Sequence, residues 1–456
     1  MIKLPEGSFC AFPFLNTLKN VLKSYWMTVI LLCLGLFCWL TDNTMICVFV
    51  YLAIFLLTLA FVEDVKILFC MVMYVSFFIN DIVEDPRWLY YIGAIACAIV
   101  ALICFLVRSM VLEKNTFRKG KLFIGFIFAL LAFTVGGIAR PNLLALLITY
   151  ALFIATYILY FIAVNKTQNL THYLCFLFFI GSIVLIAQKT INGLSNKGLI
   201  NPFNPAFYCA QNINTIAVFI MLGMIGAFGL GLGKKYGFLS ILIIPIIFFG
   251  VITTCCRTVI AVSGVIVLPL MIMLAIFAKK KLDKIYAWSA VLLIIGLALA
   301  ILFIKKEIVL EQIIQMLEKT GKGSNGRDQL WQWCWDKFEE FPIFGYGFVA
   351  DEPLPSLRND IPLVLAHNTI LQWLTSLGLI GSAFISVFYF YKYYAIFKGF
   401  RKSKIAMLAV VIALALIGTL DQSPTMDFFA FFLPLLCIAG TENDEVKRFV
   451  LVKGEK

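Results

Sequence analysis

Charged side chains are scarce in this sequence. Only 14% of its 456 residues are charged, whereas 62% are hydrophobic and the mean hydropathy is +0.97. No soluble domain buries that much apolar surface, but runs of about 20 apolar residues are long enough to span a lipid bilayer. The shortage of charge therefore excludes an ordinary soluble protein and predicts an integral membrane protein.

Two other shortages restrict the chemistry. No Cys-x-x-Cys pair occurs, so the sequence gives no sign of a zinc or thiol redox site. Histidine occurs only twice. Most of the 13 cysteines stand inside hydrophobic runs and are typical of small buried apolar residues, as at Cys33, Cys38, Cys47, Cys70, Cys97, Cys104 and Cys175.

Hydrophobic runs predict an all-α polytopic membrane protein with about fourteen transmembrane helices and one large loop, 305–366. We divide the chain into N-terminal helices over 1–204, a core over 205–391 that includes the loop, and C-terminal helices with a tail over 392–456. The predicted spans are 25–41, 44–62, 66–80, 88–107, 122–139, 142–164, 170–188, 208–232, 237–255, 258–278, 286–304, 367–391, 405–420 and 425–440.

The distribution of Lys and Arg predicts the orientation. With the N-terminus in the cytoplasm, 25 of the 37 basic residues fall on cytoplasmic segments and 12 on outer ones, seven of these in the long loop. This bias follows the positive-inside rule, so both termini are predicted to be cytoplasmic and loop 305–366 extracytoplasmic. The net charge of +12 is therefore mainly a topology signal and does not indicate nucleic-acid binding.

Arg257 departs from this charge pattern. It stands between two hydrophobic runs with almost no loop, so it is predicted to lie near the outer membrane surface. An arginine there must be paired or reach toward water, and a snorkelling residue is one interpretation. The other is a guanidinium at headgroup depth that holds a pyrophosphate through paired hydrogen bonds.

The long loop contains a predicted helix that begins near Arg327. Ser324 or Asn325 would cap this helix. It would end near Glu340, because Pro342 follows. Arg327 and the free backbone N–H groups at such a helix start favour an anion.

Three aromatic residues, Trp331, Trp335 and Phe338, share one face of this helix by their spacing. The face could rest in the membrane interface or stack on sugar rings. We favour the interface, because no carbohydrate-specific pattern accompanies these residues.

Two further features stand at the end of the loop. Gly345 and Gly347 predict a tight turn that seats the loop on the membrane, and a dinucleotide site is excluded because no strand precedes them.

His367 opens the next span beside Asn368, where an imidazole can accept a proton near neutral pH. An interface residue or a helix cap is the alternative for His367. The other histidine, His172, lies at the inner end of a span and is interpreted as structural.

Taken in order, these motifs resemble the O-antigen ligase and O-antigen polymerase superfamily of bacterial membrane glycosyltransferases. The family pattern has an arginine after a small residue at an outer helix end. A Gly-Arg-x-x-x-Trp-like stretch, a Pro-x-x-Gly-x-Gly stretch and a His-Asn-x-x-Leu helix start follow. The similar stretches here are Cys256-Arg257, Gly326 to Trp331, Pro342 to Gly347 and His367 to Leu371, with Gln211 to Asn214 similar to an earlier helix start. Cys256 stands where family members often carry serine.

The resemblance implies transfer of a glycan from an undecaprenyl-diphosphate carrier to an acceptor hydroxyl at the outer face of the bacterial cytoplasmic membrane. It implies no cofactor, metal or nucleotide sugar. Arg257 and Arg327 would bind the diphosphate and stabilise the leaving charge, while His367 would orient or deprotonate the acceptor. Further substrate-binding positions implied by the resemblance are Asn212, Trp331, Gly345, Gly347 and Asn368. Expected partners are the lipid-linked oligosaccharide, the glycan acceptor, the bilayer and other polysaccharide export or assembly proteins.

Several functions remain open at this point. A polymerase that extends capsule, exopolysaccharide or O-antigen is the first expectation, and a ligase that moves glycan onto lipid A core or another terminal acceptor is the close alternative. A lipid-linked sugar transporter or flippase would carry charged or broken helices along a central path, whereas the strongly polar residues here lie at outer ends. A structural partner of an envelope-synthesis complex would not need Arg257, Arg327 and His367 together.

Overall fold

The computed structural model of the chain describes residues 13–79, 88–112, 117–139, 143–197, 212–232, 237–254, 256–277, 281–304, 327–348, 366–398, 404–420 and 431–443. Every regular element among them is helical, which confirms the predicted all-α fold. Six of the described helices are long and apolar enough to cross a membrane, and a seventh candidate is the bent pair Asn16–Lys23 and Tyr25–Leu40. The protein is therefore an integral membrane protein, while the number of crossings stays a prediction.

The helices of the first half are α1 (Pro13–Lys23), α2 (Tyr25–Leu40), α3 (Thr44–Phe61), α4 (Ile67–Tyr74), the 3-10 turn η2 (Val75–Phe78), α5 (Trp88–Val107), the π-helical turn η3 (Arg108–Leu112), α6 (Phe123–Ala139), α7 (Leu143–Asn165) and α8 (Leu170–Lys197). The second half contains α9 (Ile213–Gly231), α10 (Gly237–Ile252), α11 (Arg257–Phe277), α12 (Lys281–Ile304), α14 (Arg327–Glu340), α15 (Thr369–Phe397), α16 (Ile405–Leu420) and a last helix over Phe431–Asn443.

Every predicted span has a helix at its position, but the span predicted at 66–80 differs from the others. It consists of the short helix α4 and the turn η2, and most of its side chains are buried in the bundle. The cysteine prediction is only partly right. Cys38, Cys47, Cys70 and Cys175 are buried, whereas Cys33, Cys97 and Cys104 are exposed. In a lipid bilayer an apolar side chain does not need protein around it, because lipid tails are equally apolar.

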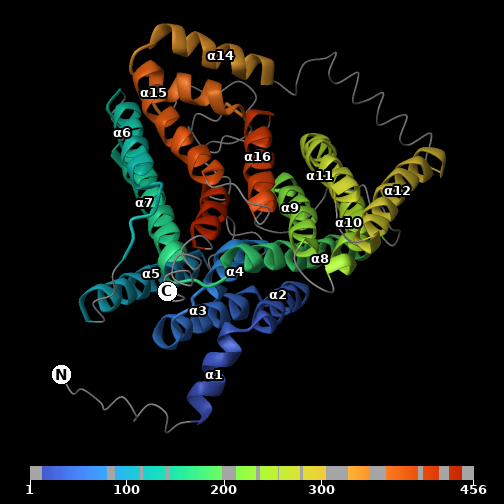
Figure 1. Cartoon of the computed structure of the whole chain (residues 1–456). Coiled ribbons are helices and arrows are strands. Elements are labelled where there is room, and N and C mark those ends of the chain that lie inside the picture. Colours follow the sequence, from blue (N-terminus) through green and yellow to red (C-terminus); the bar gives the residue numbers. More distant parts are fainter. Residues whose placement is uncertain are drawn as a thin grey trace, which may run out of the picture.

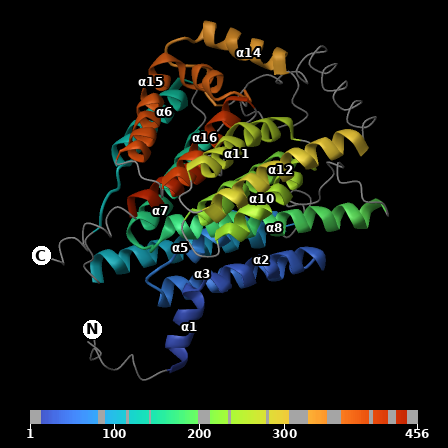
Figure 2. The ribbon, with the colours of Figure 1, turned by 45° about the vertical axis from the view of Figure 1, so that its right-hand side comes forward.

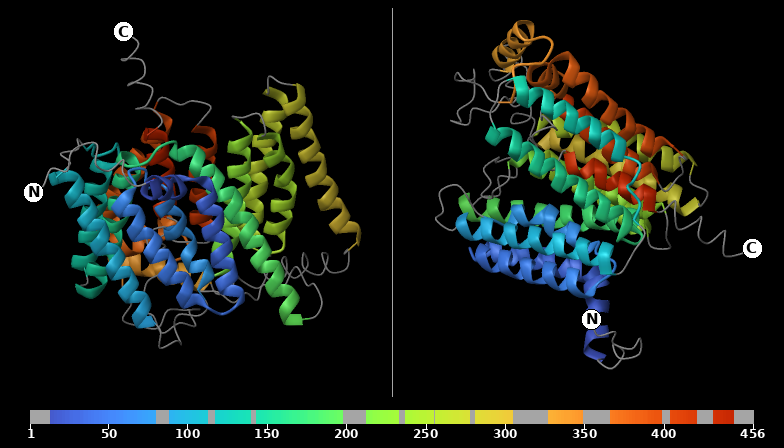
Figure 3. Two further views of the ribbon diagram at one scale, coloured as in Figure 1. Left: turned by 90° about the horizontal axis from the view of Figure 1, so that it is seen from below. Right: turned by 90° about the vertical axis from the view of Figure 1, so that its left-hand side faces the viewer.

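Most of the helices run side by side in an oblique bundle, and α14 lies across one end of it above α15 (Figures 1 and 2). In the right-hand view of Figure 3 the N-terminal helices α2 and α3 (blue) form one side of the bundle and α15 (orange) lies toward the opposite side, with α8 (green) between them. Helix α1 is turned away from α2 by 71°. The end of the bundle that α14 covers is where the polar loop predicted to carry the chemistry is attached.

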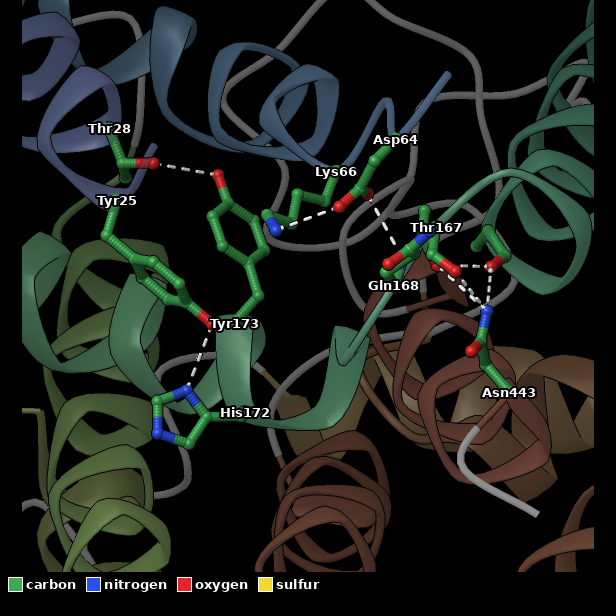
Figure 4. Close-up of polar contacts among 10 residues, drawn as sticks. Tyr25, Thr28, Asp64, Lys66, Thr167, Gln168, His172, Tyr173 and Asn443 are labelled. Carbon is green, nitrogen blue, oxygen red and sulfur yellow. Dashed lines mark hydrogen bonds and ion pairs between the residues drawn. The ribbon is translucent and has the colours of Figure 1, made fainter. Parts of the chain in front are cut away.

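A second part of the bundle is held together by a network of buried polar side chains (Figure 4). The carboxylate of Asp64 accepts a hydrogen bond from Lys66 Nζ at 2.9 Å and one from the backbone N–H of Gln168 at 3.1 Å. Asn443 Nδ2 donates to the carbonyl oxygen of Thr167 at 2.6 Å. These contacts join the turn after α3, the turn before α8 and the end of the last helix. We call this part of the molecule the network end.

His172 belongs to the same region. Its Nδ1 lies 3.1 Å from the hydroxyl oxygen of Tyr25 at the start of α2. Beside it, the hydroxyl groups of Tyr173 and Thr28 are 3.0 Å apart. The histidine therefore ties α8 to α2, in agreement with its structural interpretation.

The ion pair at the network end is expected to stabilise the fold. Replacing Asp64 by alanine leaves Lys66, which is 8% exposed, without its carboxylate. Removing one member of a buried pair typically costs about 3–5 kcal/mol, because an uncompensated charge stays buried. We expect a clearly lower melting temperature for detergent-solubilised Asp64→Ala. The neighbouring carboxylate of Glu63 is exposed, so Glu63→Ala is the matched control. Equal melting temperatures for the two variants would show that the pair does not stabilise the protein.

Candidate functional site

Helix pairing places Arg257 at the end of the bundle opposite to the network end. Helix α9 runs antiparallel to α8, because Gly229 faces Cys175 while Gly223 faces Ser182. Helix α8 begins at the network end, so α9 ends there. Ser240 near the start of α10 donates to the carbonyl oxygen of Ala227 near the end of α9 at 2.9 Å. Helix α10 therefore runs away from the network end, and α11 begins where α10 ends. We call this opposite end the site end.

The same pairing brings the start of α15 to the site end. Gly229 on α9 also faces Ala406 near the start of α16, so α16 begins at the network end and finishes at the site end. There the hydroxyl group of Thr369 donates to the carbonyl oxygen of Gly418 at 2.7 Å. Thr369 is the first residue of α15, two residues after His367. The two residues that the sequence singled out most strongly, Arg257 and His367, thus lie at one end of the bundle.

Arg257 is the first residue of α11, and its side chain is exposed. The carbonyl oxygen of the buried residue Cys256 accepts the first hydrogen bond of the helix, from Ile260 at 3.0 Å. Among the described residues, no acidic side chain pairs with Arg257. An exposed guanidinium beside the free N–H groups of a helix start is a favourable place for an anion.

Helix α14 spans Arg327–Glu340 and ends where the sequence predicts. Arg327 is its first residue, whereas its side chain and the predicted caps Ser324 and Asn325 lie outside the described part of the chain. The buried face differs from the predicted aromatic face. Leu330 and Cys334 pack with Tyr346 and Ala366 in a small core of their own.

The aromatic residues of α14 separate into two environments. Trp335 is 44% exposed and its ring lies 5.5 Å from that of Phe338. Trp331 is half-buried, and its Nε1 donates to the carbonyl oxygen of Ala366 at 2.8 Å. Trp331 therefore holds Ala366, the residue before His367, a role that its spacing with Trp335 and Phe338 did not reveal.

Helix α15 is broken at Gly378, where the backbone has φ 62° and ψ −167°. Two N–H groups freed by the break are satisfied by the loop after α14. Leu379 donates to the carbonyl oxygen of Pro342 at 2.8 Å, and Ile380 donates to that of Ile343 at 3.1 Å. On the other side of the break, the backbone N–H of Tyr346 donates to the carbonyl oxygen of Thr375 at 2.6 Å. The loop 342–346 is thus inserted into the break of α15.

The two loop glycines make this insertion possible. Gly345 and Gly347 have φ angles of 81° and 98°, which side-chain-bearing residues rarely adopt. A Cβ atom on Gly345 would lie 2.5 Å from the backbone nitrogen of Gly378. The predicted tight turn is confirmed, and it packs against the break of α15.

The two asparagines assigned to the substrate act as helix caps in this structure. The side-chain oxygen of Asn368 accepts hydrogen bonds from the N–H groups of Ile370 and Leu371, at 3.0 and 3.1 Å. Asn212 accepts one from the N–H of Asn214 at 2.9 Å, at the start of α9. Asparagine is among the preferred residues at this position. Because Asn368 is the cap of α15, His367 precedes the cap.

Three features of the site were missed by sequence reasoning. They are the break of α15 at Gly378 and the contacts made by the side chains of Gln372 and Thr375. The hydroxyl group of Thr375 donates to the carbonyl oxygen of Cys334 at 3.0 Å and fastens α15 to α14.

Burial raises the pKa of the Cys334 thiol to about 12 despite its hydrogen bond with Thr375, so Cys334 stays protonated and serves packing.

One segment of the chain matches a known protein family. Residues 241–386 match the family model described as O-Antigen ligase. A comparison with curated proteins finds no match. The matched segment covers about a third of the chain and contains Arg257, Arg327, His367 and the break of α15 at Gly378, but not Asn212. The match confirms the resemblance to the O-antigen ligase and polymerase superfamily and supports a glycosyltransferase-like ligase or polymerase role.

Proposed function

We propose that the protein transfers a glycan from an undecaprenyl-diphosphate carrier to an acceptor hydroxyl at the outer face of the bacterial cytoplasmic membrane, and that it polymerises a surface polysaccharide. The observation that carries this proposal is the position of Arg257 and His367. Both lie in the segment that matches the O-antigen ligase family, and both lie at the site end of the bundle.

The orientation in the membrane is supported by the network end. The segments that meet there are those that the distribution of Lys and Arg assigns to the cytoplasm, among them the turns at 64–66 and 165–169 and the end of the last helix. Further contacts of the same kind join Arg118 to Asn165 and Lys121 to Glu442. With the network end in the cytoplasm, the site end faces outward.

The proposed chemistry is a substitution at the anomeric carbon of the donor. The acceptor oxygen forms a bond to this carbon as the bond to the diphosphate oxygen breaks. His367 takes the acceptor proton, and the diphosphate leaves with its negative charge. Arg257 and, at the start of α14, Arg327 bind this diphosphate and stabilise the charge that develops on it. The resemblance implies that this reaction needs no cofactor or metal.

The resemblance also assigns two glycines and two asparagines to the substrate, and their proposed role is to shape the backbone of the site. Gly345 and Gly347 allow the loop to enter the break of α15, and Asn212 and Asn368 begin the helices α9 and α15. We therefore expect substitutions at these four positions to act through the backbone and not through a lost contact with the glycan.

A reconstituted assay tests the proposal and separates its alternatives. Purified protein in proteoliposomes receives an undecaprenyl-diphosphate-linked repeat unit as the sole substrate, and the products are resolved on a gel. A ladder of increasing length is the expected result and identifies a polymerase. A single shifted product that requires added lipid A core identifies a ligase. Movement of intact donor across the bilayer without a new covalent product would contradict the proposal and favour a flippase.

A further inference from the structure

Ala366, the residue before His367, is held through both of its backbone polar groups. Its carbonyl oxygen accepts a hydrogen bond from Trp331 Nε1 at 2.8 Å, and its N–H donates to Gln372 Oε1 at 2.8 Å. The two partners come from different elements, since Trp331 lies on α14 and Gln372 on α15. Ala366 itself is fully buried. Water therefore cannot replace either partner without opening the small core around Ala366.

His367 has an unfavourable backbone conformation. Its φ angle is 50°, in the left-handed region that residues with a Cβ atom seldom adopt. Such a conformation persists when the surrounding contacts determine it, and it is common at functional sites. The peptide group that sets this angle is the one joining Ala366 to His367. The contacts of Ala366 thus fix the peptide group on the N-terminal side of His367.

The orientation of Gln372 is also determined. Its side chain is 1% exposed, and its Nε2 donates to the hydroxyl oxygen of Ser376 at 2.7 Å. With the amide nitrogen used in this way, the amide oxygen faces the N–H of Ala366. Its backbone N–H donates to the carbonyl oxygen of Asn368 at 2.8 Å, within the first turn of α15. Gln372 thus binds the peptide before His367 through its side chain, while its own backbone is held in the first turn of α15.

We propose that Trp331 and Gln372 are positioning residues that hold the His367 imidazole in its reactive orientation by fixing the Ala366 peptide from two sides. This inference rests on the proposed function of His367 as the proton acceptor. It replaces the expected contact of Trp331 with the substrate by a role that acts through the backbone. A displacement of a catalytic group by about 1 Å can lower the rate by about 100-fold, so a small rotation of this peptide is sufficient to matter.

Paired substitutions test this role. Trp331→Phe keeps an aromatic ring and removes the N–H donor, and the matched control is Trp335→Phe one turn later, whose Nε1 donates to Glu339 at 2.7 Å. Gln372→Met removes the acceptor of the Ala366 N–H with little change of size. We expect kcat to fall by about 10-fold to 100-fold in Trp331→Phe and Gln372→Met. In Trp335→Phe, kcat is expected to stay near the wild-type value.

Two further measurements separate positioning from general destabilisation. The KM for the undecaprenyl-diphosphate-linked donor should stay near the wild-type value, because the diphosphate contacts are intact. In a His367→Ala background, Trp331→Phe should cause no further loss of rate, because residues that act through one group are not additive. Full kcat in both Trp331→Phe and Gln372→Met, or losses that multiply with that of His367→Ala, would overturn the inference and leave the proposed function standing. A wild-type protein that transfers no glycan would overturn both.

Discussion

Replacing Gly345 by alanine is expected to lower glycan transfer on the order of 100-fold, because it displaces the loop that is inserted into α15. The φ angle of 81° at Gly345 already costs a residue with a Cβ atom roughly 1–2 kcal/mol. The new Cβ atom would in addition lie 2.5 Å from the backbone nitrogen of Gly378. To relieve this contact, the loop at Gly345 and the helix at Gly378 would have to move apart. That movement would break the hydrogen bonds that Pro342 and Ile343 accept from the N–H groups of α15.

The matched control for this substitution is Gly264→Ala in α11. A Cβ atom on Gly264 meets no other atom within 4 Å. Alanine inside a helix is favoured over glycine by about 1 kcal/mol, so this variant should keep its stability and its activity. Transfer rates and melting temperatures of both variants are measured on protein purified in the same detergent. Wild-type transfer by Gly345→Ala would show that the inserted loop does not shape the active site.

Replacing His367 by alanine is expected to lower transfer by about 100-fold or more, the usual contribution of a positioned general base. The chain provides its own control, because its only other histidine is His172. His172 contacts Tyr25 at the network end, far along the bundle from the site end. We therefore expect His172→Ala to transfer glycan near the wild-type rate once equal amounts of folded protein are compared. Equal losses of the transfer rate in the two variants would show that His367 has no specific catalytic role.

The features that sequence reasoning predicted well are set by local rules. The bounds of α14 follow from polar residues that favour a helix start and from Pro342, which stops the helix. The turn at Gly345 and Gly347 follows from the conformations that glycine alone adopts easily. The all-α membrane fold follows from long apolar runs, since only internally satisfied backbones cross a bilayer as helices or closed barrels.

What the sequence did not reveal depends on contacts between distant segments. Gly378 breaks α15 only because residues 342–346 supply the acceptors for the freed N–H groups, and nothing near Gly378 in the sequence shows this. Gln372 receives its role from Ala366, which precedes the helix and is also held by Trp331 on α14. Spacing alone grouped Trp331 with Trp335, although the structure gives their N–H groups different partners.

The central claim is that a bond to the lipid diphosphate breaks as a glycosidic bond forms. It is tested most directly by counting both products in proteoliposomes that contain wild-type protein or Arg257→Ala. We predict that wild-type protein releases one undecaprenyl diphosphate for each glycosidic bond formed, and that Arg257→Ala slows the release and the bond formation equally. Intact lipid-linked donor that crosses the bilayer with no release of the carrier would contradict the account.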